Sequence, residues 1–173
     1  METQEQSIDT LMDELGGFVR IVDYELFNPD ENSFGLNPLQ NAPKSYETSC
    51  VEIKRFIKSL LEACNNCQTL DDQHRFRDIQ YPFEEILRNG IFHGNKAAPT
   101  LLLSLKLIEC DNGYVIRIRD SGDGYNVQSM QSAMLNRQPY FQNRGEGMKT
   151  IVFANTKVTN ENNGTAWNIV MSK

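Results

Sequence analysis

Two turn signals, each flanked by strand-like runs, constrain the fold of this 173-residue chain more than any other feature. Asp111-Asn112-Gly113 lies between residues 100–109 and 114–119, and Asn162-Asn163-Gly164 lies between residues 157–160 and 165–171. Asn and Gly accept the positive φ angles of the tight turns that join antiparallel strands. The second half of the chain is therefore predicted to form two β-hairpins.

The other segments have helical, extended or loop patterns. Apolar residues recur at helical spacing in three segments: residues 7–16, 47–63 and 71–93, the last disturbed in its early part by Pro82. Residues 18–24 alternate loosely like a strand, and residues 28–44 are rich in Asn, Pro and Gly, which is typical of a loop or linker. We predict an α+β fold, a two-layer sandwich of a mixed β-sheet with helices on one face.

Three polar residues form a stripe on the third predicted helix. Glu85, Asn89 and His93 are four residues apart, and this spacing advances about 400° around an α-helix, so their side chains follow one face. A carboxylate can take a proton from an attacking hydroxyl, and an amide oxygen can bind magnesium. Two ordinary interpretations stay open: an exposed polar face for Glu85 and Asn89, and a helix C-terminal residue beside the dipole for His93.

Two glycine motifs follow this helix. Asp120-Ser121-Gly122-Asp123-Gly124 comes after a strand-like run, and Gly145-Glu146-Gly147 comes before an apolar, helix-like run at residues 148–154. A buried carboxylate at Asp120 could accept a hydrogen bond from an exocyclic amine such as that of adenine, and backbone amides at the start of the helix could bind phosphate. Taken singly, each motif is also an ordinary turn or loop composition.

The order of these motifs resembles the GHKL-type ATP-binding domain shared by DNA gyrase, the heat-shock-90 chaperones, sensor histidine kinases and mismatch-repair ATPases. Within that superfamily, residues 45–173 look most like the bacterial anti-sigma factor serine kinases. The resemblance implies the histidine-kinase-like ATPase fold, with ATP and Mg²⁺ as cofactors. It makes Glu85 the general base, Asn89 the magnesium ligand and Asp120 the adenine-binding residue, supported by Thr165 of the final Gly164-Thr165 motif.

The remaining site residues also follow from this resemblance. His93 closes the helix motif, and the other matching positions are glycines: Gly122, Gly124, Gly145 and Gly147. Residues 125–144 match the mobile ATP lid by position, although a surface helix plus loop fits the same residues. Arg144 could reach a phosphate from there, or could be an ordinary exposed arginine.

Three positions depart from the pattern of the family. Asn143 replaces a frequent glycine, Glu146 replaces a usual hydrophobic residue, and Gly90 replaces a small alanine at some cost in helix propensity. An acidic side chain beside phosphates weakens nucleotide binding unless it points to solvent or helps to hold a metal. Nucleotide binding is therefore a firmer expectation than catalysis.

The leading hypothesis is an anti-sigma-factor-like serine/threonine protein kinase that binds Mg-ATP, phosphorylates a small antagonist protein and sequesters a sigma-factor-like regulator. One alternative is a catalytically weak, nucleotide-dependent protein-binding module, or pseudo-kinase, which Asn143 and Glu146 favour. Another is a detached histidine-kinase catalytic domain. His74 argues against the last, because it lies only eleven residues before Glu85, too near for a separate phosphoacceptor hairpin.

Charge and cysteine content limit the partners and the cellular compartment that we expect for this protein. The net charge of −6 argues against nucleic acid or an anionic membrane as the main partner. With no long apolar run and a polar first segment, we expect a cytoplasmic protein. Cys64-Asn65-Asn66-Cys67 has the spacing of a metal or redox pair, but without a second pair we expect the four cysteines to be reduced, structural thiols.

Residues 1–44 are interpreted as an N-terminal extension and linker, and residues 45–173 as the ATP-binding domain. An apolar stripe in the extension, formed by Ile8, Leu11, Met12 and Leu15, suggests that this arm mediates association, for example in a homodimer. An extra sheet edge and a partner-docking arm are the other roles that stay open.

Overall fold

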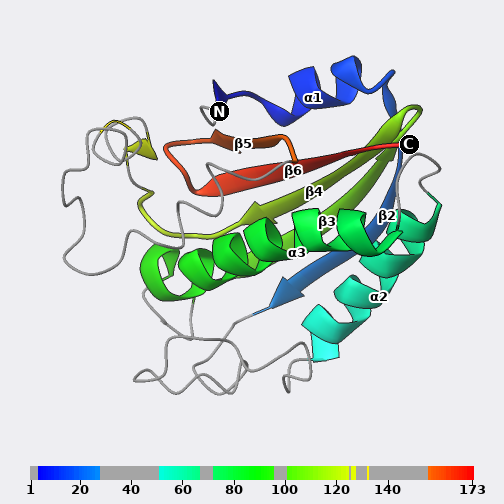
Figure 1. Cartoon of the computed structure of the whole chain (residues 1–173). Coiled ribbons are helices and arrows are strands. Elements are labelled where there is room, and N and C mark those ends of the chain that lie inside the picture. Colours follow the sequence, from blue (N-terminus) through cyan, green and yellow to red (C-terminus); the bar gives the residue numbers. More distant parts are fainter. Residues whose placement is uncertain are drawn as a thin grey trace.

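The computed structural model describes residues 4–27, 51–66, 72–95, 101–124, 126–127, 132 and 156–173. Five strands form an antiparallel sheet in the order β5-β6-β4-β3-β2, and a two-residue strand, β1, pairs in parallel with β5 (Figure 1). Their bounds are Gln4–Glu5 for β1, Phe18–Phe27 for β2, Leu103–Cys110 for β3, Gly113–Arg119 for β4, Val158–Glu161 for β5 and Ala166–Ser172 for β6. The fold is therefore α+β, as predicted.

Both predicted hairpins are confirmed. β3 and β4 pair in continuous antiparallel register, from Ser104 opposite Arg119 to Cys110 opposite Gly113. β5 and β6 are joined by a turn in which Asn162 and Asn163 have φ angles of 52° and 54°. Asn tolerates this left-handed region better than other residues with a Cβ, which is why the Asn-Asn-Gly sequence specifies the turn.

Two helices cover one face of the sheet, α2 (Val51–Asn65) and α3 (Asp72–Asn89), and α3 continues into a π-helical turn, η1 (Gly90–Gly94) (Figure 1). Phe56 of α2 and Phe83 of α3 stack with ring centroids 6.0 Å apart, and both are completely or almost completely buried. The inward side chains of the sheet meet them: Leu103, Leu105, Leu107, Ile116, Ile118, Trp167 and Ile169. This core fixes α3 against β3, β4 and β6.

The expectation of helices on one face does not hold for α1 (Ile8–Glu14). Its Leu11, together with Leu15, packs against Ile108, Cys110 and Val115. Successive residues of a strand point to opposite faces, so these side chains lie on the face opposite α2 and α3. The apolar stripe of the N-terminal segment thus packs within the same molecule. The segment also adds β1 and β2 to the two edges of the sheet.

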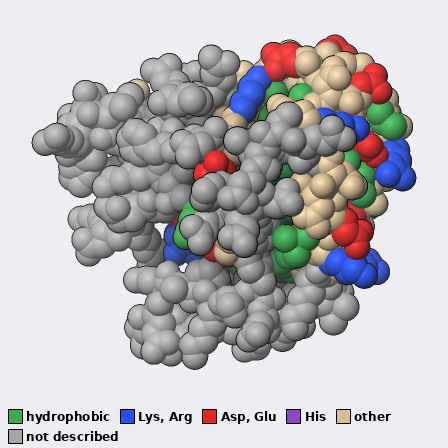
Figure 2. All heavy atoms as spheres, turned by 45° about the vertical axis from the view of Figure 1, so that its right-hand side comes forward, with side chains coloured by type: hydrophobic (Ala, Val, Ile, Leu, Met, Phe, Trp, Pro, Cys, Tyr) green, Lys and Arg blue, Asp and Glu red, His purple; other side chains and the backbone are tan. Residues whose placement is uncertain are grey.

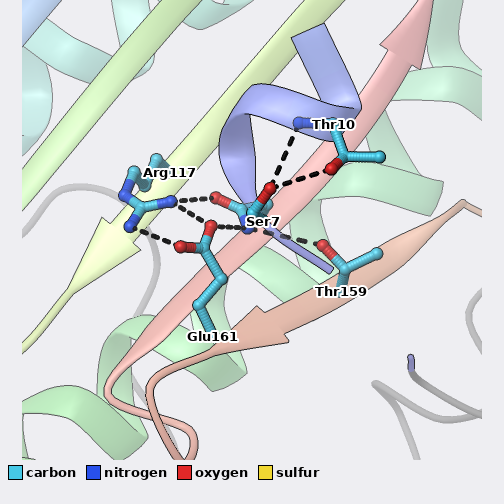
Figure 3. A network of polar contacts seen from close by, with 6 residues as sticks. Ser7, Thr10, Arg117, Thr159 and Glu161 are labelled. Carbon is cyan, nitrogen blue, oxygen red and sulfur yellow. Dashed lines mark hydrogen bonds and ion pairs between the residues drawn. The ribbon is translucent and has the colours of Figure 1, made fainter. Parts of the chain in front are cut away.

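The start of α1 lies beside a polar network on this outer face (Figure 3), and Lys157 pairs with Glu14 of the helix at 2.6 Å. Ser7 caps α1 by accepting a hydrogen bond from the backbone N–H of Thr10 at 3.2 Å. Nearby, Arg117 pairs with Glu161 at 2.5 Å and donates to Asn168 Oδ1 at 3.0 Å. Burial alone would raise the pKa of Glu161, but the hydrogen bonds from Arg117 and Asn168 outweigh it and lower that pKa. The network thus gives the partly buried Arg117–Glu161 ion pair additional hydrogen-bond partners.

The side of the molecule seen in Figure 2 mixes exposed apolar, basic and acidic side chains over its described part. Five apolar side chains of β2 are about half exposed: Phe18, Val19, Ile21, Tyr24 and Leu26. Next to them, Lys106 lies over the ring of Tyr24, 5.2 Å from its centroid. Among the described residues, no helix has the length and apolarity to cross a membrane.

Candidate functional site

Three segments that are distant in sequence meet at the C-terminal end of β4. They are the end of η1 at Gly94, the loop that begins at Asp120, and the turn before β6 at Thr165. The backbone N–H of Asp120 donates to the carbonyl of Thr165 at 2.9 Å. The structure therefore brings together three of the motifs that the sequence pointed to.

The contacts in this cluster require residues without a Cβ. A Cβ at Gly94 would lie under 3.0 Å from the Asp120 carboxylate atoms, and one at Gly122 would collide with the carbonyl oxygen of Gly94. Gly124 has a φ angle of 72°, in the left-handed region, and a Cβ there would meet the carbonyl oxygen of Asn163. Glycine is thus what lets the backbone segments approach so closely.

Asp120 is the buried titratable group of the cluster. Its side chain is 8% exposed, and Oδ1 accepts a hydrogen bond from the backbone N–H of Gly122 at 2.8 Å. Burial raises the pKa of Asp120 from 3.8 to about 6, against the lowering effects of the Gly122 hydrogen bond and the charge of Arg119. A carboxylate whose pKa is raised this far by burial is a functional-site candidate.

A buried amide that the sequence analysis did not select lies beside Asp120. Asn95, the residue after η1, is completely buried, and its Oδ1 accepts a hydrogen bond from the backbone N–H of Ser121 at 2.9 Å. Its position directly after His93-Gly94 was the available signal. That signal was weak, because an Asn after a helix is usually only an end cap.

The polar stripe of α3 is present in part. Glu85 and Asn89 are both partly buried on the last turns of α3, where the α-helical spacing assumed for them holds. His93 is exposed and lies in η1, where the wider π turn interrupts that spacing. The three residues therefore do not form the uniform α-helical stripe that we expected.

Glu85 has an ion-pair partner on its own helix. Nη2 of Arg88 lies 2.7 Å from Glu85 Oε1 and 2.5 Å from Oε2, and Nε lies 3.2 Å from Oε2. The carboxylate is thus approached at both oxygens by one guanidinium, which occupies lone pairs that a general base needs.

Several sequence predictions lie outside the described residues: Arg144, Gly145 and Gly147, the departures Asn143 and Glu146, and most of the lid segment 125–144. Of the Cys64-Cys67 pair, only Cys64 is described. Cys64 and Cys110 are buried thiols without a disulfide, and burial raises the pKa of Cys110. Within the described part, no group of three or more His, Cys, Asp or Glu side chains is arranged to hold a metal ion.

A scan against protein-family models finds no match to this chain, and a search of curated proteins finds no significantly similar sequence.

Proposed function

We propose that this protein binds Mg-ATP at the cluster of Gly94, Asp120, Gly122 and Thr165, and that it is a serine/threonine protein kinase of the anti-sigma type with the histidine-kinase-like ATPase fold. The observation that carries the proposal is the buried Asp120 carboxylate, held between glycines at the meeting point of three separate motifs. The hydrogen bond from the Gly122 N–H to Asp120 is that of an ordinary Asx turn, but such a turn does not require its carboxylate to be buried.

The chemistry of the cluster fits a nucleotide base. An ionised carboxylate accepts hydrogen bonds only, so Asp120 suits an exocyclic amine, which only donates. Backbone glycines leave room for a flat ring to approach the chain. These properties favour adenine over guanine, whose carbonyl at the equivalent position would face the carboxylate.

The helix beside the cluster fits the phosphate end of the same ligand. The position of Gly90 is next to Asp120, and Glu85 is five residues earlier, roughly 7 Å along the axis at 1.5 Å per residue. Asn89 would supply an amide oxygen to the magnesium ion, which neutralises phosphate charge when bound. Glu85 would take the proton of the attacking hydroxyl. Partners in this proposal are a small antagonist protein as the substrate and a sigma-factor-like regulator that is sequestered.

Calorimetric titration with ATP, with and without magnesium, tests the binding step. We expect saturable binding to the wild type and about a tenfold or greater loss of affinity in Asp120→Ala, since a buried hydrogen bond to a charge is removed. Asn89→Ala should weaken binding only when magnesium is present. Absence of binding to the wild type would refute the proposal.

A second candidate function, an ATP-dependent protein-binding module without turnover, is favoured by the Arg88–Glu85 ion pair. Both carboxylate oxygens of Glu85 accept hydrogen bonds from Arg88. The proposed base is therefore already paired with a cation. The two functions share the nucleotide site and differ only in whether phosphate is transferred.

Turnover measurements on Arg88→Gln separate the two functions. If the protein is a kinase and the pair restrains Glu85, Arg88→Gln should hydrolyse ATP severalfold faster than the wild type. Adding Glu85→Gln to this variant should abolish the gain. Equal, negligible hydrolysis in all three proteins, with intact ATP binding, would favour the binding module. Arg20→Gln, which removes the distant Arg20–Glu109 pair, is the matched control.

A further inference from the structure

We propose that Asn95 is a positioning residue of the nucleotide-base site: it clamps the Asp120–Gly122 loop against the end of η1 and thereby makes the site selective for a base with an exocyclic amine. This inference rests on the proposed function and names the residue that sets its base selectivity.

Asn95 joins three pieces of chain around the carboxylate. Its Nδ2 donates to the carbonyl of Leu101 at 3.2 Å, and its Oδ1 accepts from the backbone N–H of Ser121 at 2.9 Å. Its own backbone N–H donates to the carbonyl of Gly90 at 2.7 Å, which closes the π turn. One side chain thus connects the end of the helix, the approach to β3 and the residue that follows Asp120.

The orientation of this amide is unambiguous, because each partner has only one role. The Leu101 carbonyl can only accept and the Ser121 N–H can only donate, so the Asn95 oxygen must face Ser121. An aspartate of the same shape would place an acceptor against the Leu101 carbonyl. The site therefore requires an amide in particular, and not merely a side chain of this size.

The clamp acts on the distance between Asp120 and Gly94. Ser121 is held from one side by Asn95 and from the other by its own hydroxyl, which donates to the carbonyl of Leu102 at 2.8 Å. With Ser121 fixed, the Asp120 carboxylate lies so close to Gly94 that a Cβ on residue 94 would have no room. Without the clamp, the loop can move outward and water can reach the carboxylate.

Asn168 provides a matched control. It is also completely buried and also uses both ends of its amide, accepting from Arg117 at 3.0 Å and donating to Glu161 at 3.0 Å. It lies in the network on the outer face of the sheet, remote from Asp120. A loss of stability alone should affect Asn168→Ala and Asn95→Ala in the same way.

The test compares Asn95→Ala and Asn95→Asp with Asn168→Ala in the full chain. Titration of the Asp120 carboxyl by NMR, without nucleotide, should show its pKa falling from about 6 toward 3.8 in Asn95→Ala and unchanged in Asn168→Ala. Binding of ATP and of purine riboside triphosphate, which lacks the amine, should show a preference for ATP in the wild type. That preference should shrink by about tenfold in the Asn95 variants, the change that goes with a lost buried hydrogen bond.

Each outcome decides a different point. An unchanged Asp120 titration in Asn95→Ala overturns the clamp, whatever the nucleotide data show. Absence of nucleotide binding to the wild type refutes the proposed function and the base-selective role with it, while the NMR result still reports on the clamp. Loss of the folded state in both Asn95 variants also overturns the inference, because Asn95 would then serve the whole fold.

Discussion

At Asp120 the protein keeps a carboxylate where burial opposes its charge. The pKa is about 6 in the folded protein against 3.8 for the ordinary group, so the folded state holds the proton over a pH range in which the unfolded chain has released it. The free energy of unfolding should therefore fall as the pH rises from about 4 to about 6, and stay lowered above that range. Ionised Asp120 thus costs stability at neutral pH, a cost in keeping with its proposed role in binding.

Asp120→Asn should remove that cost. At pH 7 we expect the variant to be more stable than the wild type by about 1–3 kcal/mol, from a shift of about two units at 1.36 kcal/mol each. The gain should shrink on acidification and vanish below about pH 4, where both states of the wild type are protonated. Urea unfolding across pH 4–8 measures this, with the exposed Asp123→Asn as control, and a gain that persists at pH 4 would contradict it.

The order of the motifs and their resemblance to a known ATP-binding domain selected Asp120, Gly122, Gly124 and Thr165, although each motif alone is an ordinary turn composition. They were not enough to select Asn95. Its function depends on which carbonyl and which N–H surround it, and those come from segments 6 and 26 residues away. The local signal, its position directly after His93-Gly94, does not carry that information.

At the scale of single elements, the departure from the prediction is at the end of α3. Periodicity predicts that the helix continues through His93 as an α-helix, whereas the backbone widens into the π turn η1 at Gly90. Single-turn π segments of this kind are frequent at functional sites. Pro82, by contrast, lies inside α3 without ending it. The periodicity of side chains could not distinguish a π turn from an α turn, since the same apolar residues are buried in either.

The two glycines that bound η1 should respond differently to alanine. Gly94→Ala places a Cβ against the Asp120 carboxylate and should cost about 2 kcal/mol or more, in the range of overpacked cores. In Gly90→Ala the new Cβ would lie closest to the end of the Leu103 side chain, at 3.0 Å, and would reach Asp120 only at the ordinary contact distances of 3.6 and 3.8 Å. The substitution also gains up to about 1 kcal/mol of helix propensity. It should therefore be nearly neutral. Chemical denaturation of both variants measures the difference, and an equal loss in both would show that the contact with Asp120 is not decisive.

At the scale of the whole molecule, the N-terminal segment forms part of the sheet structure. Its α1 covers Ile108, Cys110 and Val115 on the outer face, and its strands lie at the two sheet edges. The sequence predicted the helix and β2, and it left an extra edge as one of three roles. It could not show which face α1 covers, because Ile108 and Cys110 could be assigned to a face only after the register of β3 was known.

Truncation of the central α1 side chain tests this integration. Leu11→Ala removes a completely buried side chain and should lower the free energy of unfolding by about 2–5 kcal/mol in one cooperative transition. Leu61→Ala, on the exposed side of α2, should change it by about 0.5 kcal/mol or less. A Leu11→Ala effect as small as that of Leu61→Ala would mean that α1 is only loosely attached.

The placement of β1 and β2 has a consequence for the order in which the chain can assemble. Gln4 pairs with Thr159, so β1 can form only after Thr159, far later in the chain, has been made. β2 likewise waits for β3, and α1 has no complete surface to cover until the first hairpin forms. Pairings this distant in sequence slow folding. We therefore expect the sheet to close only after synthesis of the C-terminal hairpin, and Leu11 and its neighbours on α1 to be exposed to chaperones until then.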